Sequence, residues 1–324
     1  MKISRRQFVK AMAAMSAASM LAACGGNSGS GSSGGKKALT FQIWDVAQKE
    51  GMEAMCAAYT QQHPDVSIEV QVTSWNEYWT KLEAAATSNQ MPDIFWMHTN
   101  ELLKYADNGM LADCTDIVEK DKFSEISLSN AMGSNGTLYA VPKDKDTVGL
   151  VYNKEMFDAA GVAYPDENWT WDDLVSASEK IYAATGKYGY MAYADDQLGY
   201  WNFVYQAGGY ILNEDKTKAG FTQPATEKAM KFYIGLQQND WCPDQTYFAE
   251  TAPGTAFFSE KGAMFLEGDW NILAELQNYP EMVGKWDVAV LPKCPDPESG
   301  DGRATISNGL CYATATNNKN LDTV

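Results

Sequence analysis

Aromatic residues with a polar neighbour recur in this chain at the points where a predicted strand gives way to a predicted helix. They are Trp44 beside Asp45, Trp75 beside Asn76, Trp96 in the run 96–99, and Trp270 beside Asp269. The face of an aromatic ring carries partial negative charge, which attracts the slightly positive C–H face of a pyranose ring. Carboxylates and amides beside the ring can bond hydroxyl groups, and carboxylates form the stronger, charge-assisted hydrogen bonds. This combination is what sugar binding requires.

A structural role competes with this interpretation, because a single tryptophan near a strand end often only packs at the rim of a sheet. Four such residues at equivalent positions favour sugar contact over rim packing. Two further carboxylates, Asp144 and Asp146, are two residues apart and would share one face of a strand. They could do acid–base work, or they could accept hydrogen bonds from a ligand. Asp195 and Asp196 form another, adjacent pair.

The chain lacks the sequence signatures of the common catalytic and nucleotide-binding sites. It has no GxSxG, P-loop, glycine-rich dinucleotide turn or HExxH. Only two histidines occur, and no CxxC pair indicates a zinc or redox site. Arg303 is the only arginine after residue 6, and the formal charge is −17, which disfavours phosphate, nucleic acid and anionic membranes as partners. We therefore expect no metal, no cofactor and no nucleic acid.

The elements that would position these residues alternate between strand and helix patterns in the first half of the chain. The predicted strands are 39–46, 67–75 and 92–98, and the predicted helices are 48–63, 77–88 and 100–109. Asn76 is the expected N-cap of the second helix. Such alternation implies βαβ units and a mainly parallel sheet with helices on both faces. Ligands of open sheets bind outside the carboxyl ends of the strands, where the aromatic residues lie.

The pattern changes at 136–153, where two short strands surround a polar link that we interpret as a crossing between two lobes. A helix is predicted at 169–186, with Thr170 as its N-cap and Gly186 as its C-cap. Another helix at 222–240 has Pro224 in its first turn. The remaining predictions are strands at 187–193, 286–293 and 309–316 and a short helix at 200–209. A length of 324 residues also favours two domains over one.

The first 24 residues have the features of a lipoprotein signal peptide. A charged segment at 4–10 precedes an apolar stretch at 11–21, which at 11 residues is too short to span a bilayer. The sequence LAAC at 21–24 resembles the bacterial lipobox, so Cys24 is the expected lipidation site. Arg5 and Arg6 resemble a twin-arginine export signal, although paired arginines also occur in general secretory signals. Residues 25–37 form a predicted flexible Gly/Ser linker.

Five cysteines follow Cys24 in the sequence, namely Cys56, Cys114, Cys242, Cys294 and Cys311. An odd number of cysteines cannot all pair within one chain. Cys56 lies on the apolar face of a predicted helix, where it is expected to fill space in the core. The sequence assigns no disulfide.

Four runs of the chain resemble, in the same order, an extracellular solute-binding protein of the carbohydrate-uptake ABC transporters. They are PDIFWMHTNELLKYADNGMLADCT at 92–115, YAVPKDKDTVGLVYNKEMFDAAG at 139–161, WTWDDL at 169–174 and KGAMFLEGDW at 261–270. This group includes maltose-binding protein and multiple-sugar-binding lipoproteins, and the resemblance covers residues 38–324. It implies a two-lobe, periplasmic-binding-protein-like α/β fold, with a mainly parallel sheet flanked by helices in each lobe and a hinge between them. It also implies binding without catalysis.

The resemblance also implies ligand-binding roles for individual residues. Trp270 corresponds to a stacking tryptophan, with Asp269 beside it as an acceptor, and Asp146 corresponds to a carboxylate contributed by the crossing loop. The other implied contacts are Trp96, His98 and Thr99 at one strand end, Tyr200, Trp201 and Asn202 from the second lobe, and, as weaker correspondences, Trp44, Asp45, Gln48, Asn76 and Asn308. No catalytic residue and no metal ligand is implied.

The expected domains are 38–145 as the first part of the N-lobe and 146–324 as mainly C-lobe, with hinge crossings and return segments to the N-lobe. Chains of this family continue beyond the position of Val324, and Asn320 or Asp322 would begin another helix, so we expect a truncated C-terminus. The implied mechanism is closure of the lobes over a sugar and presentation of the closed form to ABC transporter permease subunits. We expect an extracytoplasmic monomer, held at the outer face of the cell membrane by its lipid alone.

Two other functions stay open on the sequence. A glycoside hydrolase would need two carboxylates about 5–9 Å apart that flank one bond, and the sequence does not exclude such a pair. A binding protein for a non-sugar solute is the second alternative. Its ligand would be a metal such as ferric iron, held by clustered tyrosines, or a polyamine held by acidic groups.

Overall fold

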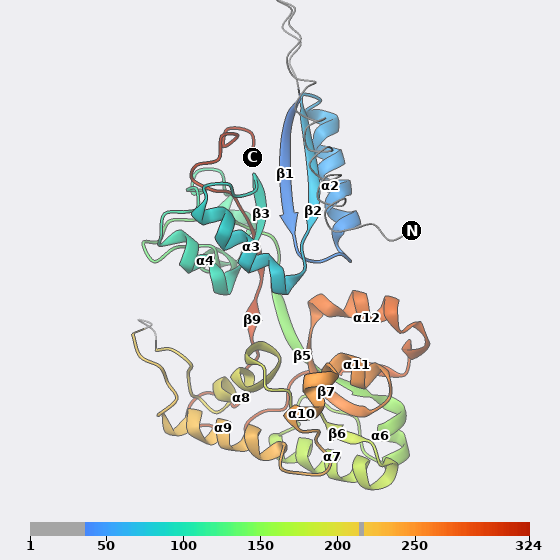
Figure 1. Ribbon diagram of the computed structural model, residues 1–324. Helices are drawn as coiled ribbons and strands as arrows, with labels where there is room; N and C mark the ends of the chain where they lie inside the picture. The colour runs from blue at the N-terminus through green and yellow to red at the C-terminus, as the bar shows by residue number, and fades with distance from the viewer. Residues whose placement is uncertain (1–35, 214–216) are drawn as a thin grey trace, which may run out of the picture.

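Two β-sheets divide the protein into two lobes (Figure 1). The computed structural model describes residues 36–213 and 217–324. The predicted signal peptide at 1–24, with Cys24, and nearly all of the predicted linker lie outside the described residues. Within the described ranges, no helix is both long enough and apolar enough to cross a membrane.

The N-lobe is built on a sheet with the strand order β2-β1-β3-β10-β4. Its strands are β1 (Lys37–Ile43), β2 (Val66–Val72), β3 (Ile94–His98), β4 (Val141–Pro142) and β10 (Leu310–Ala313). The helices of this lobe are α2 (Lys49–Gln62), α3 (Trp75–Thr87), α4 (Thr99–Ala106), the 3-10 turn η1 (Lys120–Lys122) and α5 (Glu125–Asn130). Strand β1 pairs in parallel with both β2 and β3, which confirms the predicted βαβ units.

Both faces of the N-lobe sheet are covered, which explains the continuous apolar run in β3. Phe95 and Met97 pack with Tyr78 of α3 in one core cluster. Trp96, which alternates with them along the strand, packs with Met52 of α2 in another. Only residues at the strand ends can therefore reach the surface between the lobes.

The C-lobe contains a second sheet with the strand order β6-β7-β5-β8. Its strands are β5 (Asp146–Asn153), β6 (Tyr188–Tyr190), β7 (Gly262–Gly268) and β8 (Trp286–Ala289). The α-helices around it are α6 (Lys154–Ala160), α7 (Trp171–Thr185), α8 (Trp201–Gln206), α9 (Pro224–Leu236), α10 (Gln245–Glu250), α11 (Pro253–Phe258) and α12 (Ile272–Asn278). A π-helix, η2 (Asp196–Tyr200), and two 3-10 turns, η3 (Asp269–Asn271) and η4 (Pro280–Met282), complete the lobe.

The helix caps follow the sequence closely in the C-lobe and less closely in the N-lobe. Thr170 and Asp173 form a capping box at the start of α7, and Gly186 ends that helix in the left-handed conformation, as predicted. Pro224 stands in the first turn of α9, also as predicted. The prediction that Asn76 is an N-cap is wrong. Helix α3 begins at Trp75, two residues earlier than predicted, and Ser74 is its N-cap residue.

One strand in each sheet runs against the others, and it is the strand that enters from the other lobe. Strand β10 is antiparallel to β3 and β4, and β5 is antiparallel to β7 and β8. The other strands of each sheet share one direction and bring their carboxyl ends to the space between the lobes. Strands β5 and β10 begin there, so their direction is reversed. The predicted two-lobe α/β fold is confirmed.

The two crossing segments lie against each other and form a narrow hinge (Figure 1). The start of β5 pairs with β9 (Ser307–Asn308), with Asp146 opposite Asn308. At Gly309, a Cβ atom would lie only 2.5 Å from the carbonyl oxygen of Asp144. A larger residue at this position would push the two crossing segments apart.

The five described cysteines are free thiols, and no disulfide links them. Four are buried and Cys56 is half-buried. Cys56 packs against the core cluster between α2 and the N-lobe sheet, as the helical pattern predicted.

Candidate ligand-binding cleft

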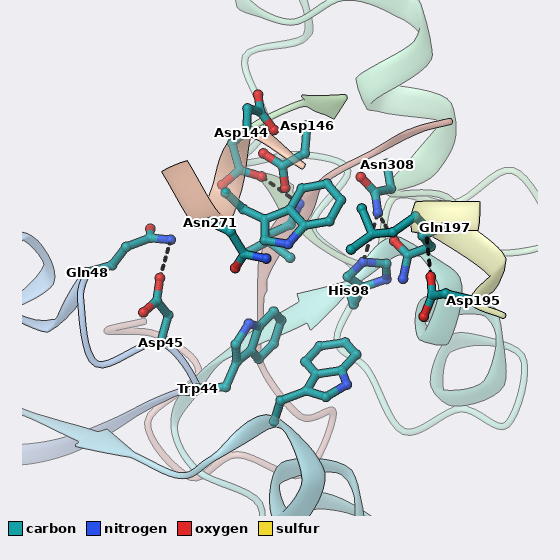
Figure 2. A pocket seen from close by; sticks show the side chains of 15 residues that line it. Trp44, Asp45, Gln48, His98, Asp144, Asp146, Asp195, Gln197, Asn271 and Asn308 are labelled. Atoms are coloured by element: carbon teal, nitrogen blue, oxygen red, sulfur yellow. Dashed lines mark hydrogen bonds between the residues drawn. The ribbon is translucent and has the colours of Figure 1, made fainter. Parts of the chain in front are cut away.

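A cavity of about 450 Å³ lies between the two lobes and beside the hinge (Figure 2). The N-lobe contributes one wall, from Trp44, Asp45, Gln48, Trp75, His98 and Leu310. The hinge contributes Asp144, Asp146 and Asn308. The C-lobe contributes the opposite wall, from Asp195, Gln197, Leu198, Asp269, Trp270 and Asn271. Strand carboxyl ends from both sheets thus meet at one cavity, as open α/β sheets lead one to expect.

The N-lobe wall is a cluster of tryptophans. The ring of Trp44, which follows β1, stands edge-on to Trp75, with ring centroids 5.1 Å apart. It also stands edge-on to Trp96, again at 5.1 Å, and to Tyr78 at 4.9 Å. Trp75 is 42% exposed, whereas Trp96 is completely buried beneath Trp44. The half-buried Trp44 therefore rests on a buried aromatic base, and the exposed Trp75 packs against Trp44.

Trp96 does not line the cavity, so the expectation that it contacts ligand directly needs correction. Helix α2 and the sheet enclose its side chain, and the ammonium of Lys143 lies 4.8 Å from its ring centroid. That ammonium also donates a hydrogen bond of 3.1 Å to the Gln48 side chain and pairs with Asp144. Trp96 thus supports Trp44 from below and helps to anchor a lysine at the edge of the site.

His98 occupies the end of β3 and caps α4. Its Nδ1 accepts the backbone N–H of Asn100 at 3.1 Å. Burial lowers the pKa of His98 to about 4, against the opposing influence of Asp196 and Asp144. The ring is therefore neutral at physiological pH and carries its proton on Nε2, which points at the side-chain amide of Asn308, 3.3 Å away. Of that amide, only the oxygen can accept the Nε2 proton. A neutral, buried imidazole of this kind positions its neighbours and has no need of a charge partner.

The hinge places two carboxylates of unequal environment side by side. Asp144 accepts the backbone N–H of Leu310 at 2.7 Å and pairs with Lys143. Asp146 receives no hydrogen bond from the described residues. Burial raises the pKa of Asp146 to about 7, and repulsion by Asp144 and Asp269 adds to this, while Lys143 acts in the opposite direction. Asp146 therefore has acceptor capacity that a ligand can use.

The C-lobe wall is centred on Trp270, in the 3-10 turn after β7. Its ring lies directly over the backbone of Gly268, where a Cβ atom would be 2.3 Å from the indole. The buried Glu267 accepts the backbone N–H of Gly268 at 2.8 Å and the side-chain amide of Asn271 at 2.9 Å. Asp269 accepts the backbone N–H of Thr147 at 3.2 Å and so ties this turn to the hinge. Burial raises the pKa of Glu267 to about 7.

The remaining part of the C-lobe wall is the start of the π-helix η2. Asp195 accepts the N–H of Leu198 at 2.7 Å and so caps this helix. Asn202 follows η2 and is completely buried. Its side chain accepts the N–H of Ile306 at 2.8 Å and donates to the carbonyl of Gln197 at 2.7 Å. Asn202 therefore holds the returning hinge segment against η2. It was predicted to contact the ligand, but it is not among the residues that line the cavity.

Eight of the predicted site residues line the cavity, namely Trp44, Asp45, Gln48, His98, Asp146, Asp269, Trp270 and Asn308. The others, Asn76, Trp96, Thr99, Tyr200, Trp201 and Asn202, are not among its lining residues. Asn76 is exposed on the first turn of α3, and Thr99 begins α4 with its N–H bonded to the carbonyl of Gly309. Tyr200 packs against the C-lobe core. For Asn76, Thr99 and Tyr200, a residue one or two positions earlier in the chain lines the cavity instead, namely Trp75, His98 and Leu198.

Several lining residues were absent from the predicted set, namely Trp75, Asp144, Asp195, Gln197, Leu198, Asn271 and Leu310. The sequence carried a signal for three of them. Trp75 belonged to the repeated aromatic–polar pattern, and Asp144 and Asp195 each belonged to a pair of close carboxylates. Nothing in the local sequence separates the other four from ordinary helix and turn residues.

Among the residues that the structure describes, no cluster of three or more His, Cys, Asp or Glu side chains is arranged to hold a metal ion. The chemistry available in the cavity is that of aromatic faces, carboxylates and amides. Such groups stack on rings and exchange hydrogen bonds with hydroxyl or amine groups.

Comparison with known families gives a match over nearly the whole described chain. A family model for "Bacterial extracellular solute-binding protein" matches residues 44–323. The lactose-binding protein of Rhizobium radiobacter is 27% identical over 267 residues, which cover 79% of this chain and 61% of that protein. The arabinooligosaccharide-binding protein of Bacillus subtilis is 27% identical over 304 residues, 89% of this chain and 67% of that one. The chain thus spans less than two thirds of the lactose-binding protein.

Solved structures show the same fold. An ABC substrate-binding protein from Listeria monocytogenes, in complex with cycloalternan, superimposes with a TM-score of 0.77 at 25% identity. The match covers 89% of this chain and 73% of that one. The cyclic alpha-maltosyl-1,6-maltose binding protein from Arthrobacter globiformis gives a TM-score of 0.71 at 26% identity, with the same coverage of 89% and 73%.

Proposed function

The chain belongs to the bacterial extracellular solute-binding protein family, and from this premise we propose that it is a receptor that binds a sugar or oligosaccharide and delivers it to an ABC-type importer. The observation that carries the proposal is the cleft itself. Trp44 and Trp75 on one lobe and Trp270 on the other face a common cavity, with carboxylates and amides between them. Aromatic faces on two sides and hydrogen-bonding groups at the edges suit a sugar ring.

Closure of the two lobes about the hinge is the proposed mechanism. We place the boundary between the lobes at residues 145 and 146, with 306–309 as the return crossing. Each lobe then moves as a rigid unit about these two segments. A ligand favours the closed state only if it makes contacts there that the open state lacks. Walls contributed by different lobes supply such contacts. The closed form then presents both lobes to permease subunits.

The relatives support a saccharide as the ligand class. Proteins named for binding lactose, arabinooligosaccharide and maltotriose match this chain, and the Listeria neighbour holds cycloalternan. We propose that residues 1–24 direct export, that Cys24 carries the lipid, and that residues 25–37 tether a monomeric body outside the cytoplasm. Two export routes, twin-arginine and general secretory, are compatible with Arg5 and Arg6.

A panel of mono-, di- and oligosaccharides tested by thermal shift, followed by isothermal titration calorimetry, tests the proposal. At least one saccharide should raise the Tm, because a ligand that binds only the folded state stabilises it. Spermidine and ferric citrate belong in the same panel. Stabilisation by either of these, with none by any saccharide, would assign the protein to a non-sugar solute.

The competing assignment as a glycoside hydrolase is tested separately. The cleft contains more than one carboxylate, so a catalytic pair is chemically conceivable. We expect a bound, labelled oligosaccharide to be recovered intact after prolonged incubation with the protein. Release of shorter sugars at a rate proportional to protein concentration would contradict a role in binding alone.

A further inference from the structure

A second, smaller cavity adjoins the cleft in the C-lobe. We call it the side cavity, and its lining includes Tyr193, Glu267 and Glu275 together with Leu198 and Asn271. Leu198 and Asn271 also line the cleft, so the two spaces meet at these residues. The side cavity has a volume of about 230 Å³, which is below the roughly 300 Å³ at which pockets for small molecules begin. It is therefore suited to hold an extension of a ligand that lies in the cleft.

Tyr193 stands at a strand end of the same kind as Trp270. It follows β6 as Trp270 follows β7, and these two strands are parallel, so their carboxyl ends lie at one edge of the sheet. Tyr193 lines the side cavity, whereas Trp270 lines the cleft. The backbone carbonyl of Tyr193 accepts the hydroxyl of Tyr233 at 2.5 Å and the N–H of Asp195 at 2.9 Å. The position of the tyrosine is thus fixed by its backbone.

The side chain of Tyr193 is only partly used by the protein. Its half-buried ring packs against Phe248, with ring centroids 5.4 Å apart. Its hydroxyl group forms no hydrogen bond with the residues that the structure describes. A ring and a hydroxyl group at the edge of a cavity can stack on a sugar and bond one of its hydroxyl groups.

Two carboxyl groups face the side cavity beside Gly254 of α11. A Cβ atom at Gly254 would lie 2.9 Å from Oε1 of Glu275 and 3.6 Å from Oε2 of Glu267. Glu267 is 6% exposed, and its Oε1 accepts both of the hydrogen bonds described above. Its Oε2, like the carboxylate of Glu275, receives no hydrogen bond within the described part of the chain. The missing side chain of Gly254 therefore leaves space next to two unused acceptors.

We propose that the ligand is an oligosaccharide and that its terminal ring occupies the side cavity. There the ring stacks on Tyr193, and its hydroxyl groups bond Glu267 and Glu275. The proposal rests on the proposed function and narrows its substrate class, because a monosaccharide in the cleft would leave the side cavity unused. Gly254 is then the residue that permits the longer ligand, since any side chain at this position would enter the space of the terminal ring.

The rest of the lining suits a neutral sugar ring. Met191, Phe265 and Leu266 are buried and contribute apolar surface, against which the C–H groups of a sugar can pack. Burial raises the pKa of both carboxyl groups, to about 7 for Glu267. Each can therefore accept a hydrogen bond when ionised and donate one when protonated, and a sugar hydroxyl group can take either role.

The test is isothermal titration calorimetry of the full chain at pH 7 with saccharides of increasing length. The probes are glucose, maltose and maltotriose; arabinose, α-1,5-arabinobiose and α-1,5-arabinotriose; and lactose with galactose. We expect one added ring to tighten the Kd about tenfold in at least one series, the upper range for one hydrogen bond. Gly254→Leu should fill the side cavity and abolish this gain, while the shorter sugar of the same series keeps its Kd.

Two further variants serve as control and as second test. Gly235→Leu makes the same change on α9, where nothing lies within 4 Å of the added Cβ atom, and should retain the gain. Tyr193→Ala removes the stacking ring without filling the side cavity and should also reduce the gain. Cooperative thermal unfolding checks that each variant folds. Gly254→Leu should pass, because its Cβ atom meets the end of the flexible, half-buried Glu275 side chain. If it does not fold, Tyr193→Ala decides.

The outcomes separate this inference from the proposed function. If no oligosaccharide of these series or of the broader panel binds more tightly than its component monosaccharides, the inference is overturned, and sugar binding stands if a monosaccharide binds. A gain that persists in folded Gly254→Leu or in Tyr193→Ala overturns the assignment to the side cavity. If no saccharide binds at all, both proposals fail. A tenfold gain that Gly254→Leu abolishes and Gly235→Leu retains supports the inference.

Discussion

The two walls of the cleft present tryptophan rings to the same space, but they hold those rings in different ways. On the N-lobe wall, Trp44 rests on the fully buried Trp96 and Trp75 packs against Trp44, in both cases through edge-on ring contacts. On the C-lobe wall, Trp270 sits on a turn whose shape depends on hydrogen bonds to carboxylates. The N-lobe wall is therefore fixed by packing, and the C-lobe wall by polar groups that can change protonation.

Because they are held differently, the two walls should have different roles in ligand binding. Packed aromatic clusters deform little, so the N-lobe wall is a preformed surface on which a ring can rest. The C-lobe turn is tied to the hinge through the bond from Thr147 to Asp269. Motion of the hinge should therefore carry Trp270 with it. We interpret the N-lobe wall as the fixed surface and Trp270 as the ring that closes onto the ligand.

The largest effect should follow from removing the base of the N-lobe wall. Trp96→Ala deletes a completely buried indole, and such truncations reduce the free energy of unfolding by about 3–5 kcal/mol. Urea denaturation followed by far-UV circular dichroism would measure this loss. A loss below about 1 kcal/mol, the level of a typical single substitution, would show that Trp96 does not support the wall.

Trp270→Ala should reverse that pattern, with a large loss of affinity and a small loss of stability. The ring is only half-buried and packs at the edge of the C-lobe core, so its removal should cost less stability than removal of the fully buried Trp96. As a central aromatic contact it should contribute at least about 2 kcal/mol to binding, or some thirtyfold in Kd. Calorimetry with the tightest-binding saccharide measures the change. Unchanged affinity in a cooperatively folding variant would refute the stacking role.

Trp75→Ala should weaken binding less than Trp270→Ala, because Trp44 remains on the same wall. Trp75 is 42% exposed and makes edge contacts with Trp44 and Trp79. We expect a loss of about 1 kcal/mol in binding, the usual worth of one aromatic contact. A loss as large as that of Trp270→Ala would mean that the two walls contribute equally.

The last prediction concerns the pH dependence of the C-lobe wall. Burial raises the pKa of Glu267 from 4.5 to about 7, so the folded state binds more protons than the unfolded state in that window. The contribution of Glu267 to stability should therefore fall as the pH rises from 4.5 to 7. Glu267→Gln, which stays neutral, should gain in Tm relative to the natural protein across this range.

Two other groups in the cleft, Asp146 and His98, titrate in the same pH range, and the comparison of Glu267→Gln with the natural protein controls for them. Asp146 gives a slope of the same sign, and His98, whose pKa is lowered, gives the opposite slope between pH 4 and 6.5. Both are present in the variant and in the natural protein, so their effects cancel in the difference. A Tm difference that is independent of pH would contradict the assigned role of Glu267.

Local pattern was enough to predict the elements and many of the residues at their ends. Strand–helix alternation predicted the βαβ units, and the capping residues of α7 and the first-turn proline of α9 were found where the sequence placed them. These features depend on neighbours within a few residues. The position of Trp96 depends instead on whether both faces of β3 are covered, which the sequence of β3 alone does not reveal.

The hinge shows why the rest of the site could not be predicted. Asp146 and Asn308 are direct neighbours in the structure and far apart in the chain. The same holds for Thr147 and Asp269. Carboxylates that are unremarkable in sequence become a repelling group only when these segments meet. Asn202 has the composition of a ligand contact, but the long-range bond to Ile306 makes it a support of the hinge.

The most direct test of the central claim is to observe both walls at once during ligand binding. Indole N–H resonances in a ¹H–¹⁵N NMR spectrum, assigned by single Trp→Phe substitutions, report on each tryptophan separately. Titration with a bound saccharide should shift the signals of Trp44, Trp75 and Trp270. The signal of Trp171, whose buried N–H bonds Gln206 at 2.7 Å, should stay in place. Shifts confined to one wall, or absent from Trp270, would contradict closure of the two lobes over a sugar.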